Sequence, residues 1–313
     1  GYLRSLYAGR RSLAAVVRAY IRRVATLLSG RRFDVVWVEK ELLPWMPALF
    51  ERIRGRPKIV VDYDDAVFHT YDQSASQLVR AMLGSRIDIV MRRADLITAG
   101  NDYLAERALR AGAGWVEDLP TVVDIERYAR KSRWAREGAL VLGWIGSPAT
   151  AHYLQPLGPV MRRLKGEIDL RAVAVGARPD QVAGTEFEAI AWSEESEVDL
   201  VRGFDVGVMP LQDHSWERGK CGYKLIQYMA CGLPVVASPV GVNKVLVSQG
   251  VSGMLADSPD DWYSALMRLA SGPELRVSQG EAGRKRVEEW YSLQVQAPRV
   301  TSMFVDVVRG RHS

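Results

Sequence analysis

The sequence has few cysteines and no long apolar run, and both features narrow its class. Cys221 and Cys231 are the two cysteines of the 313-residue chain; they lie close together, lack the spacing of metal ligands, and cannot form the disulfide framework of a secreted domain. The longest apolar runs, such as residues 233–237, have the length of a strand, whereas a membrane-spanning helix needs about 20 apolar residues. We therefore predict a cytoplasmic protein without a transmembrane segment.

Two further absences argue against other classes of protein. No G-x-G-x-x-G run follows an expected strand and opens a helix, which argues against a nicotinamide-dependent dehydrogenase. The excess of basic residues is confined to the first expected helix and no aromatic platform accompanies it, so we expect no nucleic acid partner. With 48% hydrophobic and 25% charged residues, the chain has instead the composition of a globular protein long enough for two domains.

Acidic residues are also absent before Asp34, whereas arginine is frequent in that stretch. From about residue 11 to 29 the apolar residues recur at helical spacing, with Arg11, Arg18 and Arg22 on another face. This basic amphipathic helix either attaches to an anionic membrane surface or packs on a sheet with its polar face in solvent. Because the first arginines of the chain lie outside the clearest polar stripe, we favour the second interpretation.

Short β-branched runs alternate with helix-like stretches, a pattern typical of a parallel sheet covered by helices. The alternation occurs twice. The first series of expected strands comprises residues 34–38, 58–62 and 94–99. The second series begins near Leu140 with the run at 139–147 and continues with residues 170–176, 204–210 and 233–239. We therefore predict the α/β class, with two Rossmann-like doubly wound domains facing a cleft.

The polar and largely aperiodic stretch 120–138 separates the two series and suits a domain linker. We expect a first domain at 1–122, a second at 123–295, and a carboxy-terminal helix at 296–313 that crosses back to the first domain. Because the chain opens with Gly1 and a helical pattern instead of a strand, we also expect the first domain to lack its first strand.

The segment GKCGYKLIQYMACGLPVVASPVG, residues 219–241, carries the strongest signal of a ligand site. It follows the expected strand at 204–210 and contains a helix from about Cys221 to Cys231 that ends at Gly232. Open parallel sheets bind ligands beyond the carboxyl ends of their strands, and the amino end of a helix attracts anions. We therefore expect an anion site at the start of this helix.

Two lysines accompany that expected helix end. Lys220, Lys224 and Gln227 fall at i, i+4 and i+7, so we expect their side chains on one face of the helix. Together with the backbone amides near Gly222 and Tyr223, the two ammonium groups suit a diphosphate. The alternative is a solvated polar face with ordinary lysines, because glycine–lysine clusters of this kind are common.

The run QYMACGLPVVASPVGVNKVLVSQGVSGML, residues 227–255, resembles the donor-binding half of GT-B glycosyltransferases, in particular the large retaining family four. Its members typically read EAMACG-P-VV-S, followed by a glycine turn. The resemblance covers about residues 140–291, and the tail EAGRKRVEEWYS, residues 281–292, is similar to the closing helix of the family. It implies an enzyme that moves a sugar from a nucleoside-diphosphate sugar to a glycan, lipid-linked or small-molecule acceptor, with retention of configuration and without a metal or other cofactor. The expected setting is bacterial cell-surface polysaccharide synthesis.

The sequence departs from the family at one place. Members usually carry two glutamates separated by seven residues; the second, which holds the nucleotide ribose, falls on Gln227, and the first falls on Gly219. An amide can still hydrogen-bond a ribose hydroxyl, whereas glycine has no side chain to do so. We expect Glu217 or a lysine to take over contacts near the donor sugar, within a sublineage that reads GKCGYKLIQYMACG. The alternative function is a nucleotide-sugar-binding protein that has lost turnover.

Further donor contacts are expected beyond two other strands. Gly146 and Ser147 come just after the strand that begins near Leu140, where similar enzymes bind a donor phosphate; a tight turn that needs glycine is the alternative. Trp192 and Ser193 fall where the family places the loop beside the nucleotide base, although a buried tryptophan is the usual and favoured explanation. We expect a structural role for His152.

The first domain offers a cluster of acidic residues in VVDYDDAVFHTYDQ. Asp62, Asp64, Asp65 and His69 gather at the carboxyl end of an expected strand, where this fold places catalytic or acceptor-binding groups. Buried acids need partners, so a position facing substrate competes with a structural network and, less favoured, with a metal site. Asp64, Asp65 and His69 are therefore candidate catalytic residues.

Neighbouring strand ends supply weaker candidates. Glu39, followed by Lys40, and Asn101 end neighbouring strands and are expected on the acceptor side. In the transfer itself, Lys220 and Lys224 are expected to stabilise the charge that develops on the leaving diphosphate. The sequence nominates no carboxylate as a covalent nucleophile, so the resemblance implies front-side attack, with the leaving phosphate helping to deprotonate the acceptor.

Overall fold

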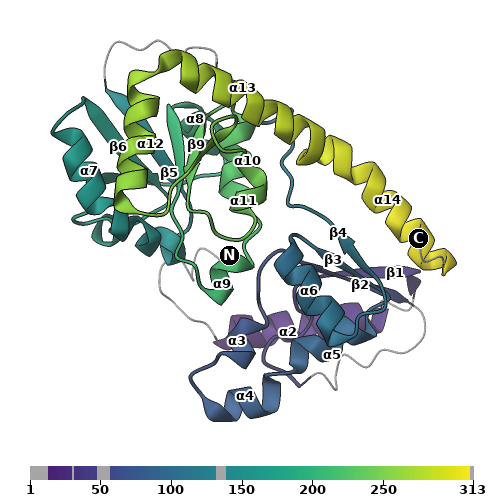
Figure 1. Cartoon of the computed structure of the whole chain (residues 1–313). Helices are drawn as coiled ribbons and strands as arrows, with labels where there is room; N and C mark the ends of the chain where they lie inside the picture. The colour runs from purple at the N-terminus through teal and green to yellow at the C-terminus, as the bar shows by residue number, and fades with distance from the viewer. Residues whose placement is uncertain (1–12, 30–31, 48–56, 132–138, 311–313) are drawn as a thin grey trace. The chain divides into compact units, whose positions relative to one another are not determined.

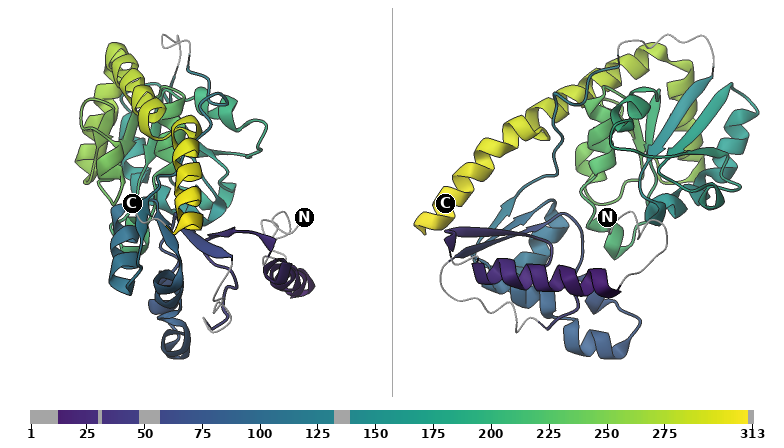
Figure 2. Two further views of the ribbon diagram at one scale, coloured as in Figure 1. Left: turned by 90° about the vertical axis from the view of Figure 1, so that its right-hand side faces the viewer. Right: turned by 180° about the vertical axis from the view of Figure 1, so that it is seen from behind.

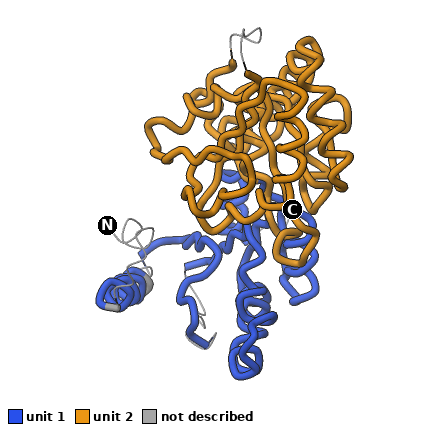
Figure 3. Tube along the Cα trace, turned by 90° about the vertical axis from the view of Figure 1, so that its left-hand side faces the viewer, with its two compact units in different colours: residues 1–120, 299–313 blue, residues 121–298 orange. Residues whose placement is uncertain are grey.

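The computed structural model of the chain describes residues 13–29, 32–47, 57–131 and 139–310. It divides into two compact units (Figures 1 and 3): unit 1 comprises residues 1–120 and 299–313, and unit 2 comprises residues 121–298. Each unit contains one parallel sheet with helices, which confirms the predicted α/β class.

Unit 1 is built on a four-stranded sheet in the order β1-β2-β3-β4. All its neighbouring strands are parallel, as expected of short apolar runs joined by helices. Its strands are β1 (Val35–Glu39), β2 (Lys58–Tyr63), β3 (Leu96–Ala99) and β4 (Val116–Asp118). The first three strands were predicted to within two residues. The fourth was missed, because its three residues are half-buried or exposed and show no apolar run.

Helices α3 (His69–Asp72), α4 (Gln77–Leu83), α5 (Arg86–Arg93) and α6 (Asp102–Ala111) connect the strands of unit 1. Helix α6 follows β3 directly. Its first turn is capped by the Asn101 side chain, which accepts a hydrogen bond from the backbone N–H of Leu104 at 3.0 Å. It ends at Gly112, whose φ of 88° is readily adopted by glycine alone. These two residues fix both ends of the helix from the sequence.

The basic amphipathic helix predicted near the amino end is α2 (Leu13–Ser29) (Figure 2). Its described side chains are exposed or half-buried, and residues of α2 line a pocket together with residues of β1. The Tyr20 hydroxyl donates to the carbonyl of Pro44, and Arg23 donates to that of Leu42 at 3.1 Å. Arg11 and the arginines before it lie outside the described residues.

Unit 2 contains a six-stranded parallel sheet in the order β10-β9-β8-β5-β6-β7. Its strands are β5 (Leu140–Ile145), β6 (Leu170–Val175), β7 (Phe187–Ile190), β8 (Val206–Met209), β9 (Val235–Ala237) and β10 (Gly253–Leu255). The chain starts at the middle of the sheet, moves outward through β6 and β7, and then returns to the other side of β5 at β8. This is the Rossmann order 3-2-1-4-5-6, which places a ligand crevice at the point of reversal between β5 and β8.

Both faces of this sheet are covered by helices. Successive side chains of a strand point to opposite faces, so Leu142 and Trp144 belong to one buried cluster and Ile145 to the other. Helices α7 (Gly158–Lys165) and α12 (Pro259–Ser271) contribute apolar side chains to the first cluster. The second cluster draws on α8 (Glu197–Arg202), α10 (Tyr223–Ala230), α11 (Asn243–Leu246) and α13 (Pro273–Trp290). Burial on both faces explains why these strands read as continuous apolar runs.

The expected linker at 120–138 requires a correction. Its described part after Pro120 belongs to unit 2: Val123 bridges to Ser292, and the side chain of Tyr128 is buried. Lys131 is buried as well and pairs with Asp205 at 2.6 Å. The polar residues that suggest a solvated linker are therefore engaged by partners elsewhere in the unit, and residues 132–138 lie outside the described residues.

The last helix, α14 (Leu293–Arg309), begins in unit 2 and ends in unit 1. Residues up to Pro298 belong to unit 2, and the remainder belongs to unit 1. There Met303 and Val307 are buried together with residues of the unit 1 sheet, and the ring of Phe304 lies edge-on to that of Trp37 at 5.2 Å. The sequence placed this helix at 296–313 with a return to the first domain.

Candidate functional site

Three strand ends of unit 2 pack closely at the carboxyl edge of its sheet. Gly146 follows β5, Gly176 follows β6, and Trp192 follows β7. A Cβ atom placed on Gly176 would lie 2.1 Å from the carbonyl oxygen of Gly146 and 3.5 Å from the Cβ of Trp192. Gly176 also has a φ of 86°, so both its neighbours and its backbone require glycine. These contacts place the loops after β5, β6 and β7 side by side.

Helix α10 begins next to the same strand ends. Its N-cap Gly222 has a left-handed φ of 70°, and Leu246 occupies the space that a side chain at this position would need. Lys224, in the first turn, reaches across Gly146, because its Cε would lie 2.8 Å from a Cβ placed on that glycine. Its ammonium group stands over the ring of Trp144 at 5.5 Å. A lysine in the first turn of a helix thus lies against the glycine turn after β5, near the end of the helix that attracts anions.

The predicted alignment of Lys220, Lys224 and Gln227 on one helical face is wrong. Because Gly222 is left-handed, the helix starts at Tyr223, and Lys220 lies in the bend before it. Lys224 is half-buried, whereas Gln227 is only 2% exposed. The helix therefore presents Lys224 toward the glycine turn and holds Gln227 in the interior of the unit.

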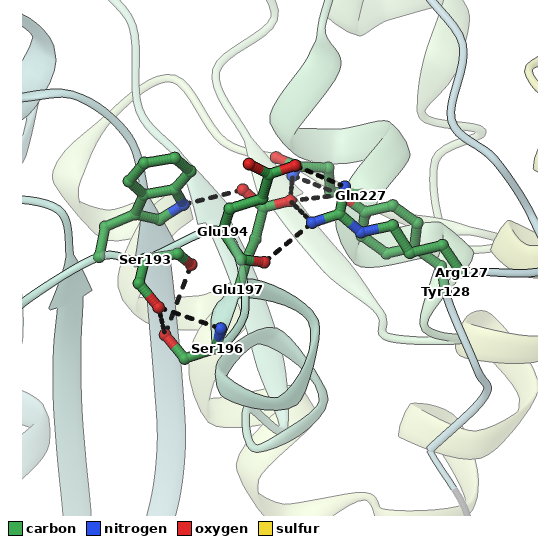
Figure 4. A network of polar contacts seen from close by, with 8 residues as sticks. Arg127, Tyr128, Ser193, Glu194, Ser196, Glu197 and Gln227 are labelled. Carbon is green, nitrogen blue, oxygen red and sulfur yellow. Dashed lines mark hydrogen bonds and ion pairs between the residues drawn. The ribbon is translucent and has the colours of Figure 1, made fainter. Parts of the chain in front are cut away.

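Gln227 belongs to a network of polar side chains (Figure 4). Its Nε2 donates to the Tyr128 hydroxyl at 2.8 Å and to Oε1 of Glu197 at 3.1 Å. The Tyr128 hydroxyl donates to the same carboxylate oxygen at 2.7 Å. The indole Nε1 of Trp192 donates to the other oxygen, Oε2, at 2.8 Å. Arg127 stands 3.9 Å from Oε1 and donates to the carbonyl of Glu194.

Two aromatic rings of this region remain exposed. The alternative that Trp192 is a buried tryptophan is wrong, because 50% of its surface is accessible although its indole N–H is bonded. Tyr223 is 45% exposed. Burial of the phenol group raises the pKa of Tyr223 above its usual value, and burial raises that of Tyr128 further. Both hydroxyls therefore remain protonated over the ordinary pH range.

Glu217 and Ser147 lie on two adjoining segments. Glu217 in α9 (Ser215–Arg218) is buried, and its carboxylate accepts a hydrogen bond from the hydroxyl of Tyr153. Tyr153 lies in the 3₁₀ segment η3 (Pro148–Leu157) that follows Ser147. The carbonyl of Ser147 accepts a hydrogen bond from the Thr150 hydroxyl at 3.0 Å. The structure thus joins α9 to the loop after β5, with Glu217 engaged by a protein partner.

In unit 1, the acidic cluster surrounds a lysine. Lys40 adopts a left-handed φ of 59°, and its ammonium group pairs with Asp64 at 2.8 Å and with Asp65 at 3.9 Å. Burial lowers the pKa of Lys40, but the hydrogen bond and the charge of Asp64 outweigh burial and raise the pKa overall. Burial raises the pKa of Asp62 to about 6, although Thr98 donates to its carboxylate at 2.5 Å. The partners of these carboxylates are thus the ammonium group of Lys40 and the hydroxyl of Thr98.

The remaining candidates of unit 1 have distinct surroundings. Both ring nitrogens of His69 are engaged, Nδ1 with Asp72 and Nε2 with the Tyr103 hydroxyl, each at 2.8 Å. Asn101 is buried as the cap of α6. Glu39 is exposed and lines a pocket of about 580 Å³ together with Lys40 and residues of α2. Of the acceptor-side candidates, Glu39 therefore opens on a cavity, whereas Asn101 is held by internal contacts, as is the catalytic candidate His69.

Metal ligands and membrane-spanning helices were also considered among the expectations for this chain, and the described residues bear on both. Within those ranges, no group of three or more His, Cys, Asp or Glu side chains could hold a metal ion. No described helix is long and apolar enough to cross a membrane. His152 is exposed, and its Nδ1 lies 3.0 Å from the carbonyl oxygen of Ala149.

Sequence reasoning missed Tyr128, Trp144, Gly176 and Glu197 as parts of the site. Gly176 ends a predicted strand, and this position could have identified it. Tyr128 and Glu197 give no local signal, because Gln227 follows them by 99 and 30 residues and they meet it only through the fold.

Residues 139–271 match the family model described as glycosyl transferases group 1. A D-inositol 3-phosphate glycosyltransferase of Saccharomonospora viridis is 28% identical over 258 residues, which cover 70% of this chain and 56% of that protein. One of Corynebacterium jeikeium is 29% identical over 120 residues, covering 38% of this chain and 27% of that protein. The chain thus spans about half the length of these curated relatives, or less.

Solved structures of similar fold cover nearly the whole chain. Sucrose-phosphate synthase from Thermosynechococcus elongatus has a TM-score of 0.74 at 16% identity, covering 92% of this chain and 77% of that one. HepE of Anabaena, in complex with UDP and glucose, has a TM-score of 0.72 at 14% identity, covering 90% and 80%. At these identities the likeness shows the fold. The chain therefore has the GT-B fold and carries a glycosyl transferases group 1 domain at residues 139–271.

Proposed function

We propose that this chain is a glycosyltransferase that moves a sugar from a nucleoside-diphosphate sugar to an acceptor hydroxyl. One observation carries the proposal: within the segment that matches the glycosyltransferase family, Lys224 and the start of α10 meet the glycine turn at Gly146. This place is the reversal point of a Rossmann-order sheet, where such folds bind nucleotides. A cation, helix N–H groups and a side-chain-free turn suit the diphosphate of the donor.

In the proposed transfer, the bond between the anomeric carbon and the β-phosphate oxygen breaks, and the acceptor oxygen bonds to that carbon on the same face. The proton of the acceptor hydroxyl passes to the leaving nucleoside diphosphate. Lys224 and Lys220 stabilise the charge that develops on this leaving group, and Glu217 contacts the donor sugar. Retention without a covalent intermediate or a metal follows from the family resemblance.

We further propose that Trp192 contacts the nucleotide base, while Gly146, Ser147, Gly222 and Tyr223 surround the diphosphate. Exposure of the Trp192 ring supports a contact with a ligand. The role of Gln227 needs revision, because its amide nitrogen already serves two internal hydrogen bonds. Gln227 then acts on the ribose through its oxygen or through the residues that it holds in place.

Unit 1 is the proposed acceptor side. Asp64 and Asp65 lie at the end of β2 around Lys40, whose left-handed backbone is a strained conformation of the kind found at functional sites. Glu39 opens on the neighbouring pocket. We propose that these groups bind acceptor hydroxyls, and that His69 and Asn101 hold the loops that carry them. A glycan or lipid-linked acceptor of bacterial cell-surface polysaccharide synthesis is the proposed class.

A donor panel tests the function. The chain is incubated with UDP-, GDP-, ADP- and CDP-sugars, with and without glycan acceptors, and release of the nucleoside diphosphate is measured. We expect release with one base in preference to the others, at a rate raised by acceptor. The engagement of Gln227 within the protein favours one second candidate, a nucleotide-sugar-binding protein without turnover. A rise in melting temperature with a sugar nucleotide but without nucleotide release would support that candidate.

A peripheral contact with an anionic membrane is proposed for α2. Its exposed apolar residues Val17, Ile21 and Val24 fall at i, i+4 and i+7 and form one stripe. Arg18 and Arg22 are exposed beside it, and no acidic residue lies within the helix. An apolar stripe flanked by arginines suits the surface of an anionic bilayer, where a lipid-linked acceptor would reside.

Vesicle flotation tests this contact. We expect the chain to float with phosphatidylglycerol-containing vesicles and to stay at the bottom with phosphatidylcholine alone. Ile21→Asp should lower the floated fraction severalfold, because a carboxylate then replaces an apolar side chain at the centre of the stripe. Val245→Asp, at an exposed apolar position of α11, is the matched control and should float like the parent chain. Equal flotation of both variants would rule α2 out as the anchor.

A further inference from the structure

Glu197 is a buried carboxylate with partners on both of its oxygens (Figure 4). Its side chain is 11% exposed. Oε1 accepts hydrogen bonds from Tyr128 and Gln227, and Oε2 accepts one from the indole of Trp192. Arg127 lies 3.9 Å away, so its positive charge faces the carboxylate. Hydrogen-bond donors and a nearby cation thus replace the water that this buried side chain has lost.

The two oxygens connect different parts of the site. Oε1 faces helix α10 through Gln227, whereas Oε2 faces the loop after β7 through Trp192. Because α10 also carries Lys224, one carboxylate links the segment proposed to bind phosphate to the segment proposed to face the base. A side chain that could accept on one oxygen only would leave one of these links without its hydrogen bond.

The Trp192 ring is held at its polar end and exposed elsewhere. Its indole N–H donates to Glu197, yet 50% of the residue is accessible. Fixing the polar tip of an exposed ring limits its rotation and presents a flat apolar face. A flat heteroaromatic ring is the ligand group that such a face suits.

We propose that Glu197 is a positioning residue that fixes the Trp192 ring for stacking on the base of the nucleotide donor. The inference rests on the proposed function and deepens it, since it concerns the base-binding part of the same site. Glu197 itself does not contact the ligand. It holds the indole at the angle that stacking requires, and it fixes the position of that ring relative to α10.

Glu197→Gln tests the proposal with two probes, UDP and inorganic pyrophosphate. An amide has one accepting oxygen and one donating NH₂ group, so it cannot accept from both Trp192 and the Tyr128–Gln227 pair. We expect the affinity for UDP to fall about tenfold, the effect of losing one hydrogen bond that orders the ring. Pyrophosphate lacks a base and should bind within twofold of the parent chain. The matched control is Glu195→Gln, in the same loop but exposed, which should change neither affinity.

A double-mutant cycle with Trp192→Phe separates positioning from general loosening of the fold. Phenylalanine keeps a flat ring but removes the N–H that Glu197 accepts, so this variant should also bind UDP less tightly. If Glu197 acts through Trp192, the double variant should bind no more weakly than the weaker single variant. Additive losses, an equal loss of UDP and pyrophosphate, or unchanged UDP binding in Glu197→Gln would each overturn the proposal. A parent chain that binds pyrophosphate but none of UDP, GDP, ADP and CDP would instead reject the proposed donor class, and the inference with it.

Discussion

Lys224→Ala is expected to reduce kcat/KM with the preferred sugar nucleotide by about 100-fold, the effect of removing one group that stabilises transition-state charge. Lys224 stands in the first turn of α10, across Gly146 and over the Trp144 ring. Its ammonium charge therefore adds to the helix N–H groups at the place proposed for the diphosphate. Charge builds up there as the glycosidic bond breaks, so kcat should fall more than ground-state donor affinity.

Two controls accompany this variant. Lys285→Ala removes a lysine of α13 whose side chain is 75% exposed, and it should leave kcat/KM unchanged. Lys224→Arg keeps the positive charge and the contact with an aromatic ring, and should retain more activity than the alanine variant. The melting temperature should change little in Lys224→Ala, because only part of this side chain is buried and its removal leaves no large cavity in the core. Activity near that of the parent chain in Lys224→Ala would remove the phosphate role from this lysine.

Gln227→Glu is expected to destabilise the chain by about 3 kcal/mol at pH 8, because it sets two buried carboxylates side by side. The Gln227 Nε2 now lies 3.1 Å from Oε1 of Glu197, and an acidic side chain would bring an oxygen to that place. Two carboxylates so close cannot both ionise, so one apparent pKa of the pair is raised above the unfolded value of about 4.3.

The sign of the pH dependence follows from this raised pKa. Below the unfolded pKa both states are protonated, and the penalty is small; it grows as the pH rises through the folded pKa. Denaturant unfolding at pH 5 and pH 8 should therefore show a larger loss for Gln227→Glu at pH 8. Gln212→Glu, at an exposed position, serves as the control without such a dependence.

The double variant Glu197→Gln/Gln227→Glu exchanges the amide and the carboxylate. The amide can then donate to the new carboxylate and accept from Trp192, and the Tyr128 hydroxyl can rotate to donate to the exchanged group. We expect it to recover most of the stability that Gln227→Glu loses at pH 8. A pH-independent effect of Gln227→Glu, or a double variant less stable than both single ones, would contradict the contact between the two side chains.

Local patterns in the sequence were sufficient for most of the strands. The run at 139–147 predicts β5, because a strand buried on both faces consists of apolar residues without a helical period. Gly232, with a φ of 73°, ends α10 where the sequence predicted, since a left-handed residue after a helix favours glycine. In the same way Gly146 was singled out as a turn that needs glycine. Each of these predictions depends on neighbours within one segment.

The features that the sequence did not predict depend on contacts between residues far apart in the chain. The polar stretch before residue 132 suggested a linker, but Tyr128 and Lys131 find buried partners far along the chain. Lys220 was expected on α10, yet the left-handed Gly222 begins the helix after it. The spacing of residues cannot reveal either outcome, because both depend on which surfaces meet.

The sequence by itself determined the α/β class, most strand positions and the segment around Gly222 and Lys224 as the candidate anion site, because hydrophobic period, glycine and proline act locally. Only the tertiary structure decided that Gln227 is buried and that Glu197 joins it to Trp192. Gln227 lies 30 residues beyond Glu197 in the sequence, and a buried carboxylate is stable only where the fold brings its hydrogen-bond donors together.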